Sequence, residues 1–465
     1  MLSILRALRQ MFVEMFGVTQ EAVLRLFVDA TEQGMIPDFI LRAGIRVLLK
    51  RRVAEVLQLH RSGFSQPWQP ASKRVLQPSW QASPLGPGQP STAQAAAMLS
   101  ILRALRQMFV EMFGVTQEAV LRLFVDATEQ GMIPDFILRA GIRVLLKRRV
   151  AEVPLDLKTR LQQTVSFAEE LKAMPIAINT DEANSQHYEV PTPYYLLCLG
   201  SHLKYSSCLY QSSRDTLDQA EFNMLNLYCE RAQLQPGQRV LELGCGWGSF
   251  SLFAAARYPA STFTAVSNSA TQKAFIDEEA RKRGITNLTV LTANVVELEA
   301  PGELYDRVVS IEMFEHMKNY QKLLHKVASW LLPEGKLFVH IFVHRSTPYH
   351  FEVKSEADWM SKYFFTGGTM PSLDLLLYFQ DDMVLRNHWY VDGCHYSRTL
   401  EAWLLRHDRH GREVTTILEG AYKGSKDSAT VWFYRWRMFY IACSELFKYR
   451  GGEEWGVGHY LFERR

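Results

Sequence analysis

The chain has 465 residues, of which 47% are hydrophobic, 12% aromatic and 22% charged. This composition is typical of a folded globular protein and excludes a disordered or collagen-like chain. The length exceeds the roughly 250–300 residues at which single cores stop growing, so more than one structural unit is expected. The net charge of +3 is too small to predict binding to nucleic acid.

The cysteines and the apolar segments of the sequence indicate where in the cell the protein is located. Six cysteines are scattered along the chain without a CxxC pair, so neither a disulfide framework nor a cysteine metal site is predicted. The sequence has no run of about 18 apolar residues and no cleavable signal pattern. We therefore expect a cytoplasmic protein without stable membrane insertion.

The N-terminal third contains an internal duplication. Residues 1–56 recur without a single difference as residues 98–153. Solenoid repeats diverge in sequence while they keep a pattern, so this identity indicates a recent duplication or a gene-model artefact and not a repeat fold. Residues 57–97 hold six prolines and no acidic residue, a composition that predicts a disordered linker. We expect the ancestral protein to start at Met98.

The duplicated prefix changes how the charge and length are interpreted. Each copy carries eight basic and six acidic residues, and the linker carries three basic ones. Residues 1–97 therefore contribute +5 to the net charge of +3, and residues 98–465 contribute −2. The part that starts at Met98 is mildly acidic and has the length of one domain with additions.

Two amphipathic helices are predicted in the second copy. Apolar residues recur at helical spacing over 123–127 and 136–145, and Pro134-Asp135 opens the second helix. Basic residues at 147–149 close it with a charge that suits a helix C-terminus. A targeting peptide or membrane-surface anchor is the alternative. Because acidic residues interrupt the pattern, we interpret the pair as a helical cap.

A glycine-rich turn follows the first predicted strand. Residues 239–257 (RVLELGCGWGSFSLFAAAR) predict a buried strand, a turn and a helix. Glycines at a strand's carboxyl end let the backbone approach a ligand, so Gly244 and Gly246 predict a nucleotide-like cofactor. An NAD site would place an acidic residue after the second strand, 261–266, where this chain has Asn268 and its flanking serines. NAD is therefore the minority interpretation.

Strand and helix segments continue to alternate after this turn. Further strands are predicted at 288–291, 307–311 and 335–341. The alternation is typical of an α/β fold with a doubly wound, mostly parallel sheet, which binds its ligands at the carboxyl ends of the strands.

Three polar residues follow the strand at 307–311. If residues 310–317 (SIEMFEHM) are helical, Glu312 shares one face with Glu315 and His316. Two carboxylates and an imidazole are the residue types that bind a cation and move a proton. A solvated helix face is the alternative.

Four motifs carry a family resemblance: LELGCGWG at the glycine turn, SIEMFEHMKNY from residue 310, YFFTGGTMPS at 363–372 and YFQDD at 378–382. With them the chain resembles the plant coclaurine N-methyltransferase-like branch of the cyclopropane fatty acid synthase family, over roughly 345 residues from Leu121 to the end. The resemblance implies a Rossmann-like methyltransferase fold, S-adenosylmethionine as co-substrate and a small, aromatic or heterocyclic amine as methyl acceptor. Methyl or methylene transfer to unsaturated phospholipid acyl chains is the alternative.

The resemblance also implies a division of the chain. After the duplicated segment (1–56) and the linker (57–97), we expect a helical cap (98–215), a cofactor-binding core (216–345) and a substrate-side lid with the C-terminal part of the fold (346–465). Homodimerisation is left open. A non-catalytic scaffold is the hypothesis from a different class.

Roles for single residues come from the resemblance. It assigns amine binding and proton removal to Glu189, Glu315 and His316, with Glu312 close by. A carboxylate and a base suit an amine, because alkylamines are mostly protonated near neutral pH. The implied cofactor contacts are Tyr205, Ser206, Gly244, Gly246, Asn268, Gln272, Asn294, Val295 and Ile311. No metal site is expected.

Two positions depart from the family pattern. Ser207 replaces a cysteine of the bicarbonate-type site of the cyclopropane synthases, whose other positions match Glu315, His340 and Tyr396. This loss weakens the lipid interpretation. Asn294 stands where family members commonly have Asp, which removes a charge from the cofactor site.

Aromatic residues are dense in the C-terminal third, from Trp432 to Trp455. Trp432, Trp436 and Phe439 recur at helical spacing, which favours a place in the core. We expect other members of the set to form a lid that binds a planar amine by stacking and cation–π attraction.

Overall fold

The computed structural model describes residues 117–178, 190–299, 304–355, 358–423, 425 and 427–465. The first copy, the predicted linker, the beginning of the second copy and Glu189 lie outside the described residues. Residues 121–465 belong to one unit, whose elements are given below.

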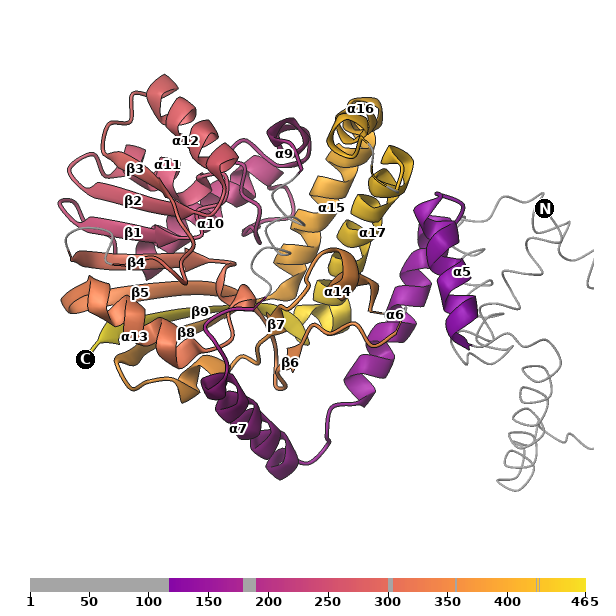
Figure 1. The fold of residues 1–465 in the computed structure, drawn as a ribbon, viewed down its shortest axis with the longest axis horizontal. Helices are drawn as coiled ribbons and strands as arrows, with labels where there is room; N and C mark the ends of the chain where they lie inside the picture. The colour runs from indigo at the N-terminus through magenta and orange to yellow at the C-terminus, as the bar shows by residue number, and fades with distance from the viewer. Residues whose placement is uncertain (1–116, 179–189, 300–303, 356–357, 424, 426) are drawn as a thin grey trace, which may run out of the picture. The chain divides into compact units, whose positions relative to one another are not determined.

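One sheet organises the described part of the chain, with the strand order β3-β2-β1-β4-β5-β9-β8 (Figure 1). In that order the strands are Leu288–Thr292, Thr262–Ser267, Arg239–Leu243, Tyr305–Ile311, Leu331–His344, Trp455–Arg464 and Met383–Val391. Strands β1 to β5 pair in parallel, and β9 pairs antiparallel with both β5 and β8. The predicted doubly wound, mostly parallel sheet is confirmed.

The five strands predicted from sequence are all present, and β5 is longer than predicted. Strands β8 and β9 were not predicted. Strand β8 lies at the edge of the sheet, where polar and half-exposed residues interrupt any apolar run. Strand β9 is buried almost throughout but carries two glycines and a histidine, so its composition gives no clear strand signal.

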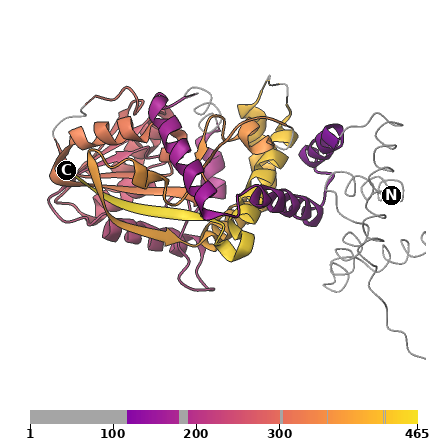
Figure 2. The same cartoon turned by 90° about the horizontal axis from the view of Figure 1, so that it is seen from below.

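Helices cover both faces of the sheet (Figure 2). One layer holds α10 (Leu217–Arg231), α11 (Ser249–Arg257) and α12 (Ala270–Lys282), and the other holds α7 (Leu157–Ala173) and α13 (Tyr320–Trp330). Leu323 and Val327 of α13 are fully buried against the sheet. Because both faces are covered, β1 is buried from Val240 to Leu243, Glu242 included.

A second group of helices packs together beside the sheet (Figure 1). It consists of α6 (Asp135–Ala151), α9 (Thr192–Cys198), α15 (Gly393–Arg409), α16 (Gly411–Ala421) and α17 (Ala429–Lys448), with α5 (Gln117–Glu129) preceding α6. The start of α6 after Pro134 and its basic last turn are as predicted. Arg139 of α6 forms ion pairs with Glu401 of α15 at 2.6 Å and with Glu445 of α17 at 3.1 Å.

Short elements complete the chain between the larger ones. They are η1 (Phe314–His316), β6 (Tyr349–His350), α14 (Trp359–Tyr363), β7 (Thr369–Met370), η2 (Leu375–Tyr378) and η3 (Tyr449–Gly452). None of the helices in the described ranges is both long enough and apolar enough to cross a membrane.

Removal of residues 1–97 is expected to leave the folded unit intact, because α5 and α6 come from the second copy and supply the ion pairs to α15 and α17. We expect a chain that starts at Met98 to melt within about 2 °C of the full chain, measured by circular dichroism. The control lacks residues 1–153, and therefore α6 as well, and should melt clearly lower. A large drop for the first truncation would show that residues 1–97 contribute to the fold.

Candidate active site

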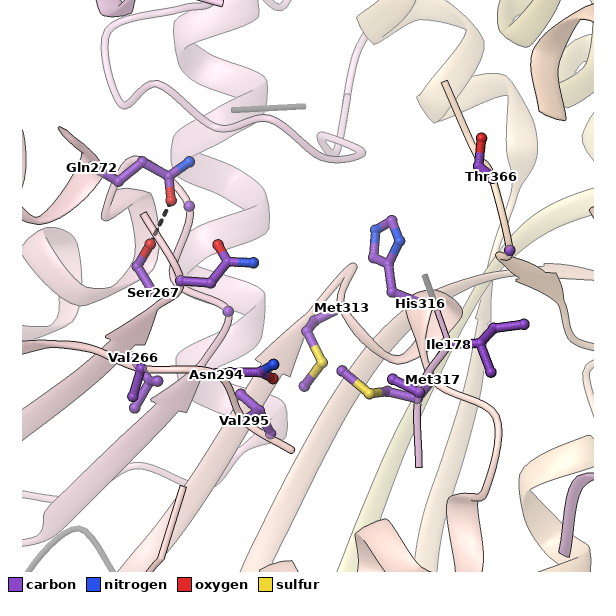
Figure 3. A pocket seen from close by; sticks show the side chains of 16 residues that line it. Ile178, Val266, Ser267, Gln272, Asn294, Val295, Met313, His316, Met317 and Thr366 are labelled. Atoms are coloured by element: carbon purple, nitrogen blue, oxygen red, sulfur yellow. Dashed lines mark hydrogen bonds between the residues drawn. The ribbon is translucent and has the colours of Figure 1, made fainter. Parts of the chain in front are cut away.

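A cleft lies at the carboxyl ends of the first parallel strands (Figure 3). The space inside it, including its open mouth, is about 750 Å³. Its lining residues are Ala177, Ile178, Gly244, Gly246, Val266, Ser267, Asn268, Gln272, Ala293, Asn294, Val295, Met313, His316, Met317, Thr366 and Gly367. Six of the predicted cofactor contacts are thus brought together: Gly244, Gly246, Asn268, Gln272, Asn294 and Val295.

The glycine turn presents bare backbone to this cleft. Gly244 and Gly246 have φ angles of 76° and 52°, in the left-handed region that glycine tolerates best. A Cβ atom on Gly244 would come within 2.8 Å of the Met313 side chain. At Gly246 no atom lies within 4 Å of such a Cβ. The turn therefore leaves room at Gly246 for a ligand to approach the main chain closely.

Polar side chains on the strand ends next to the glycine turn are fixed by local hydrogen bonds. The Ser267 hydroxyl donates to Gln272 Oε1 at 2.7 Å (Figure 3). Asn294 Oδ1 accepts from the backbone N–H of Val296 at 3.0 Å. Oriented amides beside the apolar Val295 and Met313 are the mixture that recognises a heterocycle with polar edges.

Three predicted cofactor contacts are not among the residues that line the cleft. The Tyr205 ring stacks on Trp403 with centroids 5.4 Å apart, the Ser206 hydroxyl accepts from Lys204 Nζ at 2.5 Å, and Ile311 is the last residue of β4. Their contact with a cofactor stays a prediction.

The helical geometry predicted for residues 310–317 is wrong. Strand β4 runs to Ile311, and the N–H of Glu312 still donates to the carbonyl of His340 on β5 at 2.9 Å. Glu312 then takes a left-handed φ of 46°, and the short 3₁₀ helix η1 begins only at Phe314. The hydrogen bond to the neighbouring strand β5 therefore keeps Glu312 out of the helix. Such a backbone costs about 1–3 kcal/mol in a residue other than glycine and tends to occur at functional sites.

Glu312 is instead the centre of a hydrogen-bonded cluster. Its carboxylate accepts from the N–H of Ser207 at 3.1 Å, from Nε2 of His340 at 3.0 Å and from the hydroxyl of Tyr396 at 2.6 Å. Burial raises the pKa of Glu312 to about 7, although the charge of Lys204 and the donated hydrogen bonds oppose the shift. The resemblance matched Glu315 with His340 and Tyr396, whereas the structure gives Glu312 the hydrogen bonds to both.

Glu315 and His316 lie on η1, next to the cleft. Glu315 is 2% exposed, and within the described ranges its Oε2 atom has no hydrogen-bond partner. Burial and the negative charge of Glu312 raise the pKa of Glu315 well above its usual value. The His316 ring stacks on the Phe365 ring, with the ring centroids 5.9 Å apart, and points into the cleft (Figure 3). Glu315 and Glu312 are close enough to interact electrostatically, but neither lines the cleft itself.

Sequence reasoning missed two residues that line the cleft, Thr366 and Gly367, and the lysine that binds the backbone next to them. The ammonium of Lys318 donates to the carbonyl of Gly368 at 3.0 Å and to the Thr369 hydroxyl at 2.8 Å. Burial lowers the pKa of Lys318 to about 8. The signal was present, since the lysine belongs to the motif SIEMFEHMKNY, but the spacing alone does not reveal its distant partner.

The C-terminal aromatic residues contribute to the core. Trp436 is fully buried and Phe439 is 5% exposed, which confirms the core assignment of these two. None of the described residues that line the cleft comes from 432–455, so an aromatic lid from this stretch stays a prediction. All six cysteines are free thiols, and the described ranges hold no group of three His, Cys, Asp or Glu side chains that could bind a metal ion.

Comparison with known proteins gives concordant matches. The family model of the mycolic acid cyclopropane synthetases matches residues 177–451. The (S)-coclaurine N-methyltransferase of Thalictrum flavum subsp. glaucum is 39% identical over 352 residues, 75% of this chain and 97% of that enzyme. Pavine N-methyltransferase of the same plant is 36% identical over 353 residues, 75% of this chain and 98% of that enzyme. The crystal structure of coclaurine N-methyltransferase with N-methylheliamine and SAH is similar with a TM-score of 0.72 and 38% identity, and the match covers 74% of this chain and all of that one.

Proposed function

Because the chain belongs to the mycolic acid cyclopropane synthetase family, we propose that it is an S-adenosylmethionine-dependent methyltransferase that acts on the nitrogen of a small, aromatic or heterocyclic amine. The similarity to amine-methylating relatives along nearly their whole length supports this activity. The solved relative with an N-methylated amine and SAH supports the pairing of cofactor and acceptor.

The cleft fits S-adenosylmethionine. Gly244 and Gly246 would hold it through their exposed backbone, while Asn268, Gln272, Asn294 and Val295 would surround its adenosine part. When bound, it supplies a methyl group on a positively charged sulfur, which is already activated for transfer. The residues of this chain therefore have to desolvate the amine, align it and remove its proton.

The observation that carries the proposal is the unpaired Oε2 atom of Glu315, buried beside His316. An ammonium ion offers this atom both an N–H donor and a positive charge, and it also offsets the repulsion between Glu315 and Glu312. An acyl chain offers neither, and would leave the buried carboxyl without a partner. We assign binding of the ammonium to Glu315 and removal of its proton to His316, which points into the cleft. Glu189, the other residue assigned to the amine, lies outside the described residues.

Lipid modification is the second candidate, and the family itself favours it. The cluster around Glu312 argues against it. The Ser207 N–H, His340 and Tyr396 occupy positions that the resemblance assigns to a bicarbonate-type site, and all three already donate to the carboxylate of Glu312. A second anion at the same donors would meet like-charge repulsion. Bicarbonate therefore has no place in this cluster.

Labelled S-adenosylmethionine separates the two candidates. The full chain is incubated with the methyl-labelled compound and a panel of benzylisoquinoline-type amines, and in parallel with vesicles of unsaturated phospholipid. We expect label in the amines and none in the lipid. Label in the acyl chains alone would reject N-methylation, and label in neither would favour a non-catalytic scaffold.

Further parts of the proposal concern location and assembly. We propose a cytoplasmic enzyme that acts without nucleic acid, and the six free thiols support a reducing compartment. Homodimerisation is proposed as a state to be measured by light scattering of the full chain.

A further inference from the structure

Two histidines that the proposed reaction does not use connect the Glu312 cluster to the end of helix α10. His340 on β5 and His459 on β9 are register partners in adjacent antiparallel strands. Nδ1 of His340 lies 2.8 Å from Nε2 of His459, and Nδ1 of His459 lies 2.6 Å from NH1 of Arg231. With the 3.0 Å contact between His340 Nε2 and Glu312, these contacts form an unbroken row of hydrogen bonds.

The direction of each hydrogen bond follows from its ends. A guanidinium only donates, so Nδ1 of His459 must be the acceptor for Arg231. Both imidazoles are fully buried, and burial, followed by nearby charges that include Arg231, lowers the pKa of each well below its usual value. Each ring is therefore neutral, with one donor and one acceptor nitrogen. His459 then donates from Nε2 to His340, and His340 donates from Nε2 to the carboxylate of Glu312.

We propose that Arg231 and His459 are positioning residues that fix the tautomer of His340, so that its Nε2–H faces Glu312 and favours the ionised form of this carboxylate. The inference rests on the proposed function, in which Glu312 adds negative charge next to the amine-binding Glu315. Without His459, the proton of His340 can move to Nδ1, because the Tyr228 hydroxyl lies 2.9 Å from that atom and can accept it. Nε2 would then be an acceptor that faces Glu312, and the carboxyl would have to be protonated to pair with it.

Other charged groups around Glu312 stay in place when His459 is changed. Lys204 is the nearby cation that favours the ionised form, and Glu315 is the second carboxyl. The remaining titratable groups that the charge of Glu312 reaches are Cys208, Tyr228, Tyr396 and Cys443. Burial raises the pKa of all four of these groups, so they are neutral at working pH, and a shift in the pH profile reports on the histidine row.

The test compares His459→Leu, which removes the donor, with His459→Gln, which retains an N–H in a side chain of similar reach. For His459→Leu we expect the acidic limb of the pH profile of kcat/KM to move up by about one pH unit, so that activity below the limb falls about tenfold. The alkaline plateau should stay within about twofold, and His459→Gln should restore much of the original profile. Arg231→Met, at a half-buried helix end, should shift the limb in the same direction. Arg386→Met on β8 is the control, because Arg386 pairs with Glu463 and not with the row.

A second readout does not depend on catalysis. In ¹⁵N-histidine spectra of the full chain, His340, assigned through His340→Gln, should carry its proton on Nε2 and should lose this preference in His459→Leu. A proton on Nδ1 in the unmodified protein would overturn the inference even if amines are methylated. Unchanged pH profiles in folded His459→Leu and Arg231→Met would overturn it as well. If no amine is methylated while the spectra show the expected tautomer, the proposed function fails and the histidine row stands.

Discussion

Replacement of Glu315 by Gln is expected to lower kcat for amine methylation by about 10²-fold, because the amine that Glu315 binds would no longer be held in line with the methyl group. The substitution keeps the shape of a side chain that is 2% exposed. It removes the charge that would hold the ammonium. It can also put an N–H₂ group, which cannot accept a hydrogen bond from the ammonium, in the place of the Oε2 atom that has no partner in the described structure. Affinity for S-adenosylmethionine should change little, because Glu315 does not line the cleft.

The measurement combines steady-state kinetics with calorimetric titration of S-adenosylmethionine. Glu170→Gln on α7 is the matched control, because this carboxylate is largely exposed and contacts His350 at 3.2 Å; it should retain activity within about twofold. Equal loss of kcat in both variants, or an intact kcat in Glu315→Gln, would remove Glu315 from the reaction.

The pH dependence of the unmodified enzyme should point the same way. Burial raises the pKa of Glu312 to about 7, and burial together with Glu312 raises that of Glu315 well above its usual value. A raised pKa means that the carboxyl gains its proton, and loses its charge, at a higher pH than usual. Binding of a cation therefore weakens as the pH falls through the neutral range, and kcat/KM should fall with it.

The sequence was sufficient for the five parallel strands and for one wall of the cleft, and the reason is local. The glycine turn, the amide at Asn268 and the strand ends are set by neighbours within a few residues, so their positions follow from spacing and from the α/β rule for strand ends. Six predicted contacts accordingly line one cleft.

The side of the site that we assign to the amine could be predicted only as residue types. Glu312 is not part of the expected helix because its N–H donates to the carbonyl of His340, 28 residues further along the chain. His459 reaches the cluster only through the antiparallel pairing of β9 with β5. Neither contact has a local sequence signal, since both depend on which strands become neighbours and in which register.

Arg435→Met is expected to lower the free energy of unfolding by about 3–5 kcal/mol, the usual cost of leaving one member of a buried ion pair alone. Arg435 on α17 is 3% exposed and makes two hydrogen bonds to the Glu129 carboxylate on α5, at 3.0 and 3.1 Å. It also pairs with Asp427 at 2.7 Å. In the variant, the buried Glu129 would keep a single described side-chain donor, Trp359 of α14 at 3.0 Å.

Urea unfolding measures this loss, and two further variants define its cause. Arg281→Met removes an arginine of an exposed pair with Glu278 and should cost less than about 1 kcal/mol. Glu129→Gln combined with Arg435→Met leaves no buried charge and should recover part of the loss. Since Trp359 precedes the segment that contributes Thr366 to the cleft, a kcat that also falls per folded molecule would mean that this ion pair helps to hold the cleft wall in place. An unchanged kcat would mean that the Arg435–Glu129 ion pair stabilises the fold and has no part in methyl transfer.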